Sequence, residues 1–88
     1  MRFMEQVNRR ANKAIIRVIK NQIHQNEPPE TRETFDRLLS EGYARDEAHR
    51  LLGCVLTAEI YDMMEQERVF DETLYVKRLR DLPKLPWD

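Results

Sequence analysis

The chain has 88 residues, of which 41% are hydrophobic and 35% charged, and its formal net charge is −1. That length suits one domain over residues 1–88, while two glycines are too few for an all-β sandwich and the apolar content is too high for a disordered chain. No apolar run approaches 18 residues, and the basic start lacks an apolar core region, so we expect neither a membrane span nor a signal peptide. The single cysteine, Cys54, cannot form an internal disulfide, which indicates a reducing, cytoplasmic location.

The first predicted element is a long amphipathic helix over residues 2–25. Its apolar stripe repeats at helical spacing and consists of Met4, Val7, Ala11, Ala14, Ile15 and Val18. The opposite face is basic and consists of Arg2, Arg9, Arg10, Lys13, Arg17 and Lys20. With one acid, Glu5, these give residues 1–24 a net charge of +5, whereas nine basic and fifteen acidic side chains give residues 25–88 a net charge of −6.

Two prolines and a glycine delimit a short second helix over residues 29–40. Pro28 and Pro29 end the first helix, and proline is tolerated in the first turn of the next. Gly42 then supplies a C-terminal cap, since it adopts positive φ without a steric penalty.

The third predicted helix, residues 45–67, is apolar around most of its circumference, which is typical of a central element. A fourth helix over residues 72–82 begins after an N-cap at Asp71, with Phe70 and Tyr75 spaced as a hydrophobic staple. Pro83 and Pro86 leave residues 82–88 as an extended tail. The sequence therefore predicts an all-α fold with four helices, long-short-long-short, arranged as two antiparallel helical hairpins.

Two polar residues interrupt the apolar stripes of the long helices. Gln22 lies at the centre of the first stripe, and Glu59 lies within the third. A buried carboxylate requires a partner, so we expect a small polar site between these helices, with His24 or Asp62 at its edge. A structural role is favoured, because one acid without a second converging group cannot perform acid–base chemistry unaided. The alternative is that the stripe drifts and Glu59 reaches water.

The spacing of potential ligands predicts neither a metal nor a cofactor. His24 and His49 are the only histidines, and neither has a second histidine or a cysteine at ligand spacing. Cys54 lies on an apolar helix without an activating histidine, so we expect an inert core thiol. We expect no catalytic residues, because the sequence contains no phosphate loop, nucleophile elbow or dinucleotide fingerprint.

These features favour a non-enzymatic structural or protein-interaction module. The alternative is nucleic-acid binding through the basic face of the first helix, for which the candidates are Arg9, Arg10, Lys13, Arg17 and Lys20. That face lacks the aromatic side chains typical of single-strand binding, and it could instead be solvated or pair with acids elsewhere.

Self-association as a homodimer is the further expectation. The neighbouring helices are too short to cover the third helix, so an apolar patch at its C-terminal end is predicted to meet a second copy about a two-fold axis. The candidate contacts are Tyr61, Met63 and Met64. A competing arrangement folds the tail of residues 82–87 back over this patch.

One stretch of the chain resembles a known family. The matching residues are Asn21-Gln22, Pro28-Pro29-Glu30, Thr34, Arg37-Leu38, Glu41-Gly42-Tyr43, Glu47-Ala48 and Gly53-Cys54-Val55-Leu56. Over about residues 10–66 the chain resembles an uncharacterised family of small bacterial all-helical domains. The family pattern places histidines on the first helix, where this chain has Ile16, and an H-E-A-x-H string on the central helix, where it has Asp46 and Arg50 around Glu47. The resemblance implies a helical, bacterial, cytoplasmic protein whose metal or hydrolase-like site is degenerate, with an exposed Asp46–Arg50 pair in its place.

Overall fold

The computed structural model describes the backbone of residues 2–88 and the side chains from Asn12 onward. Its elements are four helices: α1 (Arg2–Gln25), α2 (Pro29–Ser40), α3 (Arg45–Gln66) and α4 (Glu72–Asp81). Over this part of the chain there is no strand, so the predicted all-α class is confirmed, and each boundary lies within one residue of the expected one. Among the described residues, no helix is both long enough and apolar enough to cross a membrane.

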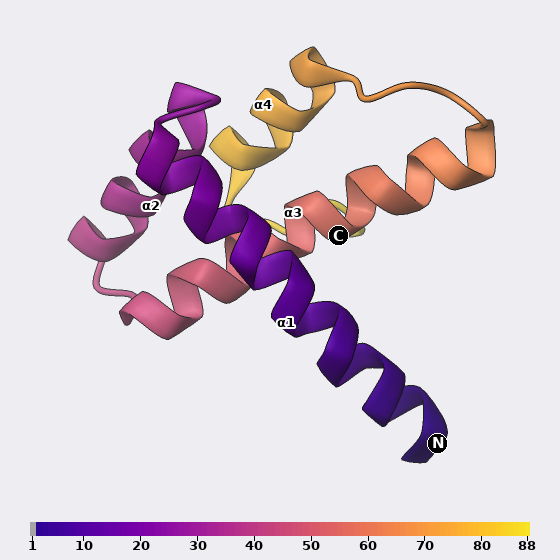
Figure 1. Ribbon diagram of the computed structural model, residues 1–88. Coiled ribbons are helices and arrows are strands. Elements are labelled where there is room, and N and C mark those ends of the chain that lie inside the picture. Colours follow the sequence, from indigo (N-terminus) through magenta and orange to yellow (C-terminus); the bar gives the residue numbers. More distant parts are fainter. Residues whose placement is uncertain (1) are drawn as a thin grey trace.

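Each helix contacts the next one in the chain, and α1 also contacts α3 while α2 contacts α4. Figure 1 shows α1 crossing α3 obliquely, with its N-terminal turns projecting away from the other helices. The buried core draws on all four helices and on the residue after α4: Ile19, Phe35, Leu38, Ala48, Leu52, Val55, Leu56, Tyr75, Leu79 and Leu82.

Local signals set the helix ends as predicted. Gly42 adopts φ +101°, and its N–H donates to the Leu39 carbonyl, so it closes the end of α2. The Asp71 carboxylate accepts a 3.0 Å hydrogen bond from the Leu74 N–H and caps α4. The rings of Phe70 and Tyr75 lie 5.1 Å apart, which confirms the staple.

The face of α1 that packs on the core differs from the predicted stripe. Ile19 is fully buried and Ile15 and Ile23 pack against the core, whereas Val18 is 42% exposed and Ala14 is exposed. Relative to the predicted orientation, α1 is rotated about its axis so that its three isoleucines face the core. Burying them removes more apolar surface from water than burying Ala14 and Val18 would. The residues Met4, Val7 and Ala11 of the predicted stripe lie outside the described side chains.

Gly53 sets the distance between α1 and α3 at their crossing. A Cβ at Gly53 would lie 3.2 Å from Ile15 Cγ2 and 3.3 Å from Ile16 Cδ1, closer than ordinary contact. The missing side chain therefore allows the two helices to approach.

The C-terminal tail is turned, and the expected extended conformation is wrong. The Lys84 N–H donates to the Asp81 carbonyl, and the Asp88 N–H donates to the Leu85 carbonyl. These turns bury Leu82 and return the chain to α3, where the C-terminus lies in Figure 1.

Candidate functional site

Glu59 lies on the side of α3 that faces α4 and the connection between them. Its side chain is fully buried and accepts three hydrogen bonds. Arg68 Nη1 lies 2.7 Å from Oε2 and Nη2 lies 3.1 Å from Oε1, while the Asp71 N–H donates to Oε2 over 2.9 Å. This bidentate Arg68–Glu59 ion pair holds the connection between α3 and α4 against α3.

A second ion pair lies beside the first. Arg78 Nη2 of α4 is 2.8 Å from Asp62 Oδ2 of α3, and Arg78 Nη1 is 3.9 Å from Glu59 Oε1. Asp62 also lies 3.9 Å from Arg68 Nη2. The cluster therefore matches two carboxylates with two guanidinium groups, and Asp62 lies at the edge where the sequence predicted it.

The contact with Arg68 keeps the Glu59 carboxylate ionised. Hydrogen bonding to Arg68 holds the pKa of Glu59 below its usual value, although burial acts in the opposite direction. A carboxylate held ionised in this way is a poor proton donor near neutral pH, and the cluster is suited to fixing structure.

Gln22 belongs to a separate polar cluster. Its Oε1 accepts hydrogen bonds from Thr31 Oγ1 over 2.8 Å and from the Tyr75 hydroxyl over 3.0 Å, and so joins α1, α2 and α4. Thr31 and Tyr75 are fully buried. Burial raises the pKa of Tyr75 to about 12, so its hydroxyl keeps the proton that it donates to Gln22.

The predicted single site between the first and third helices is thus two sites. Gln22 faces α2 and α4, whereas Glu59 binds the connection that follows its own helix. Sequence reasoning found both polar residues because each interrupts an apolar stripe. The sequence pattern does not indicate Arg68 or Arg78. These residues reach Glu59 only because the chain reverses direction after α3 and α4 packs against it. His24 is exposed and belongs to neither cluster.

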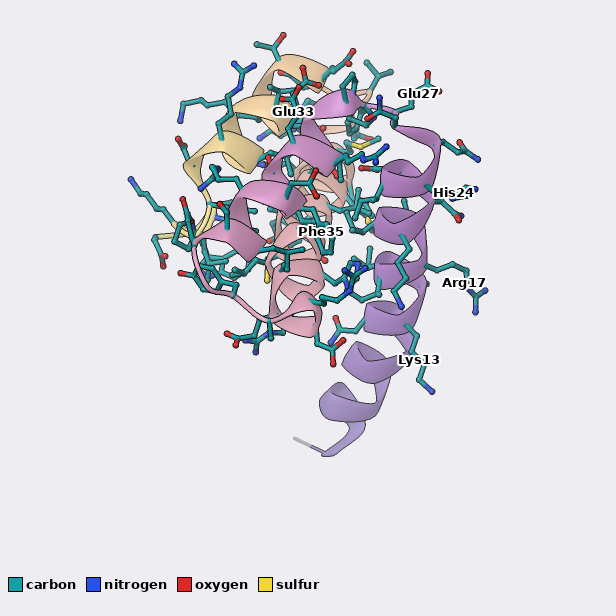
Figure 2. All side chains as sticks on the ribbon, turned by 90° about the vertical axis from the view of Figure 1, so that its left-hand side faces the viewer. Lys13, Arg17, His24, Glu27, Glu33 and Phe35 are labelled. Atoms are coloured by element: carbon teal, nitrogen blue, oxygen red, sulfur yellow. The ribbon has the colours of Figure 1, made fainter. Side chains whose placement is uncertain are left out.

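The basic face of α1 is open to solvent where the structure describes it. Lys13, Arg17 and Lys20 are exposed, and none of them forms an ion pair with a described residue. In Figure 2, Lys13 and Arg17 point outward from α1, away from the other helices. The candidates Arg9 and Arg10 lie outside the described side chains.

A groove of about 610 Å³ runs along the line where α1 and α3 meet. Its lining residues are Asn12, Ile15, Ile16 and Lys20 of α1, Asp46, His49, Arg50, Gly53, Cys54 and Thr57 of α3, and Trp87 of the tail. The expected Asp46–Arg50 pair is not among the ion pairs of the described residues, and both side chains stand at the groove instead.

Two titratable groups report on the environment of this groove. Desolvation and the positive charges of Lys20 and Arg45 lower the pKa of His49, whose ring stacks on Phe35 with centroids 4.7 Å apart. Burial raises the pKa of the Cys54 thiol, which agrees with an inert cysteine. Cys54 is half-buried beside the groove, however, and is not part of the core.

The predicted self-association residues lie at the C-terminal end of α3. Tyr61 is 62% exposed and Met64 is 74% exposed, while Met63 is half-buried. A shallow hollow joins Tyr61 to Pro86 and Trp87, so the tail lies beside this patch. The tail does not cover it, since Tyr61 and Met64 both remain mostly exposed.

Among the described residues, no three histidine, cysteine or acidic side chains are grouped so as to hold a metal ion. Comparisons with protein-family models, with curated proteins and with solved structures find no match to this chain. The resemblance to a family of small bacterial helical domains stays a prediction.

Proposed function

We propose that this chain is a non-enzymatic protein-interaction module of the cytoplasm, whose contact surface is the C-terminal half of α3 and whose partner is a second copy. The observation that carries the proposal is the exposure of Tyr61 beside an exposed Trp87, with the exposed Met64 three residues further along α3. Contiguous apolar patches on a folded protein usually mark an interaction surface, and tryptophan and tyrosine are common anchors of such surfaces. The lone free cysteine supports the cytoplasmic location.

The polar interior supports a non-enzymatic role. Glu59 is bound by Arg68 and by a backbone N–H, and Tyr75 is held protonated. Each of these groups is committed to a contact that joins helices, as expected of side chains that fix a fold.

Sedimentation equilibrium at tens of micromolar tests the proposal. We expect a mass near twice the 10.6 kDa of the chain, and a mass near 10.6 kDa for the double variant Y61K/M64K, since two lysines in the contact would be desolvated. The matched control is V69K, because Val69 is 82% exposed but lies after α3. Far-ultraviolet circular dichroism checks that each variant is folded.

Three results would overturn the proposal. The first is a wild-type mass near 10.6 kDa throughout the concentration range. The second is loss of association in V69K to the same extent as in the double variant. The third is unfolding of Y61K/M64K, which would mean that the patch is covered within the monomer.

Nucleic-acid binding through α1 is the second candidate. The specific observation that favours it is that Lys13, Arg17 and Lys20 are exposed on one helix without an acidic partner among the described residues. Fluorescence anisotropy with labelled duplex DNA and with RNA at low salt tests it. Binding through phosphates would weaken steeply with salt and would be lost in K13E/R17E, whereas absence of binding at low salt removes this candidate.

A further inference from the structure

We propose that two copies pair through α3 in an antiparallel manner, about a two-fold axis near Thr57, so that the acidic C-terminal half of α3 in each copy lies in the basic α1–α3 groove of the other. This inference rests on the proposed function and deepens it by naming the register and the charge pair that select the partner.

The seam for this contact is a row of α3 residues with coiled-coil spacing. Arg50, Cys54, Thr57, Tyr61 and Met64 follow one another at intervals of four and three, the spacing of positions that face a partner helix. All but the half-buried Cys54 are exposed. At about 1.5 Å per residue the row is about 21 Å long, enough for several turns of helix contact.

The two halves of this row have opposite chemical character. At the N-terminal half, Arg50 and Lys20 stand at the groove with Asp46 as the one acid among its lining residues. At the C-terminal half, Glu65 is exposed next to Met64 in the chain, and Glu67 is exposed directly after the helix. None of Lys20, Arg50 and Glu65 has an ion-pair partner within the described chain.

Antiparallel pairing about an axis between Thr57 and Ala58 brings these halves together, because facing positions are then equally distant from that point. Position 54 then faces position 61 of the second copy, and position 50 faces position 65. The Tyr61 ring meets the half-buried Cys54 beside the groove, and the Glu65 carboxylate meets Arg50. Because a two-fold contact repeats every interaction, each dimer gains two Arg50–Glu65 pairs.

Trp87 lies at the centre of this arrangement. It lines both the α1–α3 groove and the hollow beside Tyr61, and Thr57 lines the same two spaces. Its 61% exposed indole therefore lies close to the proposed axis, where the contact is most completely shielded from water.

The occupant is a second copy and not a foreign acidic segment, because one helix carries both complementary halves. An acidic peptide from another protein would fill only the groove and would leave Tyr61 and Met64 in water. Self-pairing covers the groove and the patch at once, through the same surface on both chains.

Charge reversal with complementary mixing tests the register. R50E and E65R each place like charges opposite each other twice in a homodimer, so we expect about tenfold or greater weakening of self-association for each. An equimolar mixture of the two variants should associate again, because every facing pair in the mixed dimer has opposite signs. The double variant R50E/E65R should also recover. R32E, which reverses an exposed charge on α2, is the control that should associate as the wild type does.

Each other outcome decides against the register. If R50E and E65R associate normally while Y61K/M64K does not, the interaction module stands and the antiparallel pairing is wrong. If R50E alone loses association, the groove takes a different acidic segment and the pairing is again wrong. Failure of the mixture to recover would overturn it as well, and a monomeric wild type would overturn the proposed function itself.

The single tryptophan supplies a second measurement. Dimer formation should shift the emission of Trp87 to shorter wavelength as concentration rises, because its exposed indole becomes shielded from water. R50E should keep the long-wavelength emission of the monomer at the same concentrations. Association of the wild-type chain without a change in Trp87 emission would place the contact elsewhere.

Discussion

At the scale of single residues, the ion pair around Glu59 connects stability to charge. Burial alone would favour the protonated acid, but Arg68 and the Asp71 N–H bind the ionised form more strongly. Removing the carboxylate leaves the Asp71 N–H without its acceptor and Arg68 without its partner. The partly exposed Arg68 can recover some hydration, which limits the loss.

E59Q is therefore expected to lower the free energy of unfolding by about 2 kcal/mol. The measurement is urea unfolding followed by circular dichroism at pH 7. The control E33Q changes an exposed glutamate on α2 and should alter stability by less than about 0.5 kcal/mol. Equal effects of the two substitutions would contradict the importance of the buried pair.

The same pair predicts a pH dependence. The pKa of Glu59 is lower in the folded chain than in the unfolded chain, so the unfolded state binds more protons in acid. The stabilisation is complete above the pKa of an unfolded glutamate, about 4.5, and is lost as pH falls through the lower pKa of the folded chain. The difference in urea midpoint between wild type and E59Q should shrink in acid, and a difference that grew there would reverse the assigned direction.

The residues of the two polar clusters also show what a sequence can and cannot indicate. Glu59 and Gln22 stand out because each is polar at an apolar position of a helical repeat, and that signal is local. Arg68 is polar in a polar connection and therefore carries no such signal. Its contact with Glu59 depends on the turn after α3, where Glu67 adopts a left-handed conformation with φ 48°.

At the scale of elements, helix ends were predictable and helix faces less so. Pro28-Pro29, Gly42 and Asp71 act on their immediate neighbours, and the helices begin or end beside them. The orientation of α1 depends instead on what it packs against. The sequence pattern predicts that Ala14, Val18 and Ile15 are all buried. In the structure, the isoleucines of α1 pack against the core, and Ala14 and Val18 are exposed.

Gly53 makes that crossing testable. A valine there would place its Cβ 3.2 Å from Ile15 Cγ2 and add two methyl groups in the same space. We expect G53V to lower the free energy of unfolding by about 2 kcal/mol, as overpacked core substitutions do. The control A14V adds the same branched side chain at an exposed position of α1, and thermal unfolding should show a much smaller effect. A stabilised G53V would mean that α1 and α3 separate readily.

At the scale of the whole molecule, the near-neutral chain carries its excess of basic residues on α1 and its excess of acidic residues on the rest of the chain. The ion pairs of the described residues lie at the end of α2, within α4, and among α3, α4 and the connection between those two helices. None of them involves the exposed lysines and arginine of α1. The basic outer face seen in Figure 2 thus remains available to an acidic partner. The sequence showed this asymmetry directly, since it needs only a count of charges along the chain.

Arg37 of α2 extends across to the end of α4. Its Nη2 donates to the Leu82 carbonyl over 2.8 Å and lies 3.3 Å from the Leu79 carbonyl, so α2 caps the C-terminus of α4. The guanidinium thus adds to the bond that the Leu82 N–H donates to the Leu79 carbonyl, and a fluctuation that opens α2 removes this support from the last turn of α4. The two helices should behave as one cooperative opening unit, a property that no contact within either helix reveals.

Amide hydrogen exchange would detect this coupling. Protection of the Leu82 N–H, which donates to the Leu79 carbonyl, should match the protection of the α2 amides in the wild-type chain. In R37A the Leu82 amide should exchange faster while the amides of α2 remain protected, whereas R32A, at an exposed position of the same helix, should leave both unchanged. Independent exchange of the two helices in the wild type would show that the guanidinium does not couple them. If the two helices instead exchange together and R37A releases the Leu82 amide, a side chain of one helix sets how often the end of another helix opens to solvent.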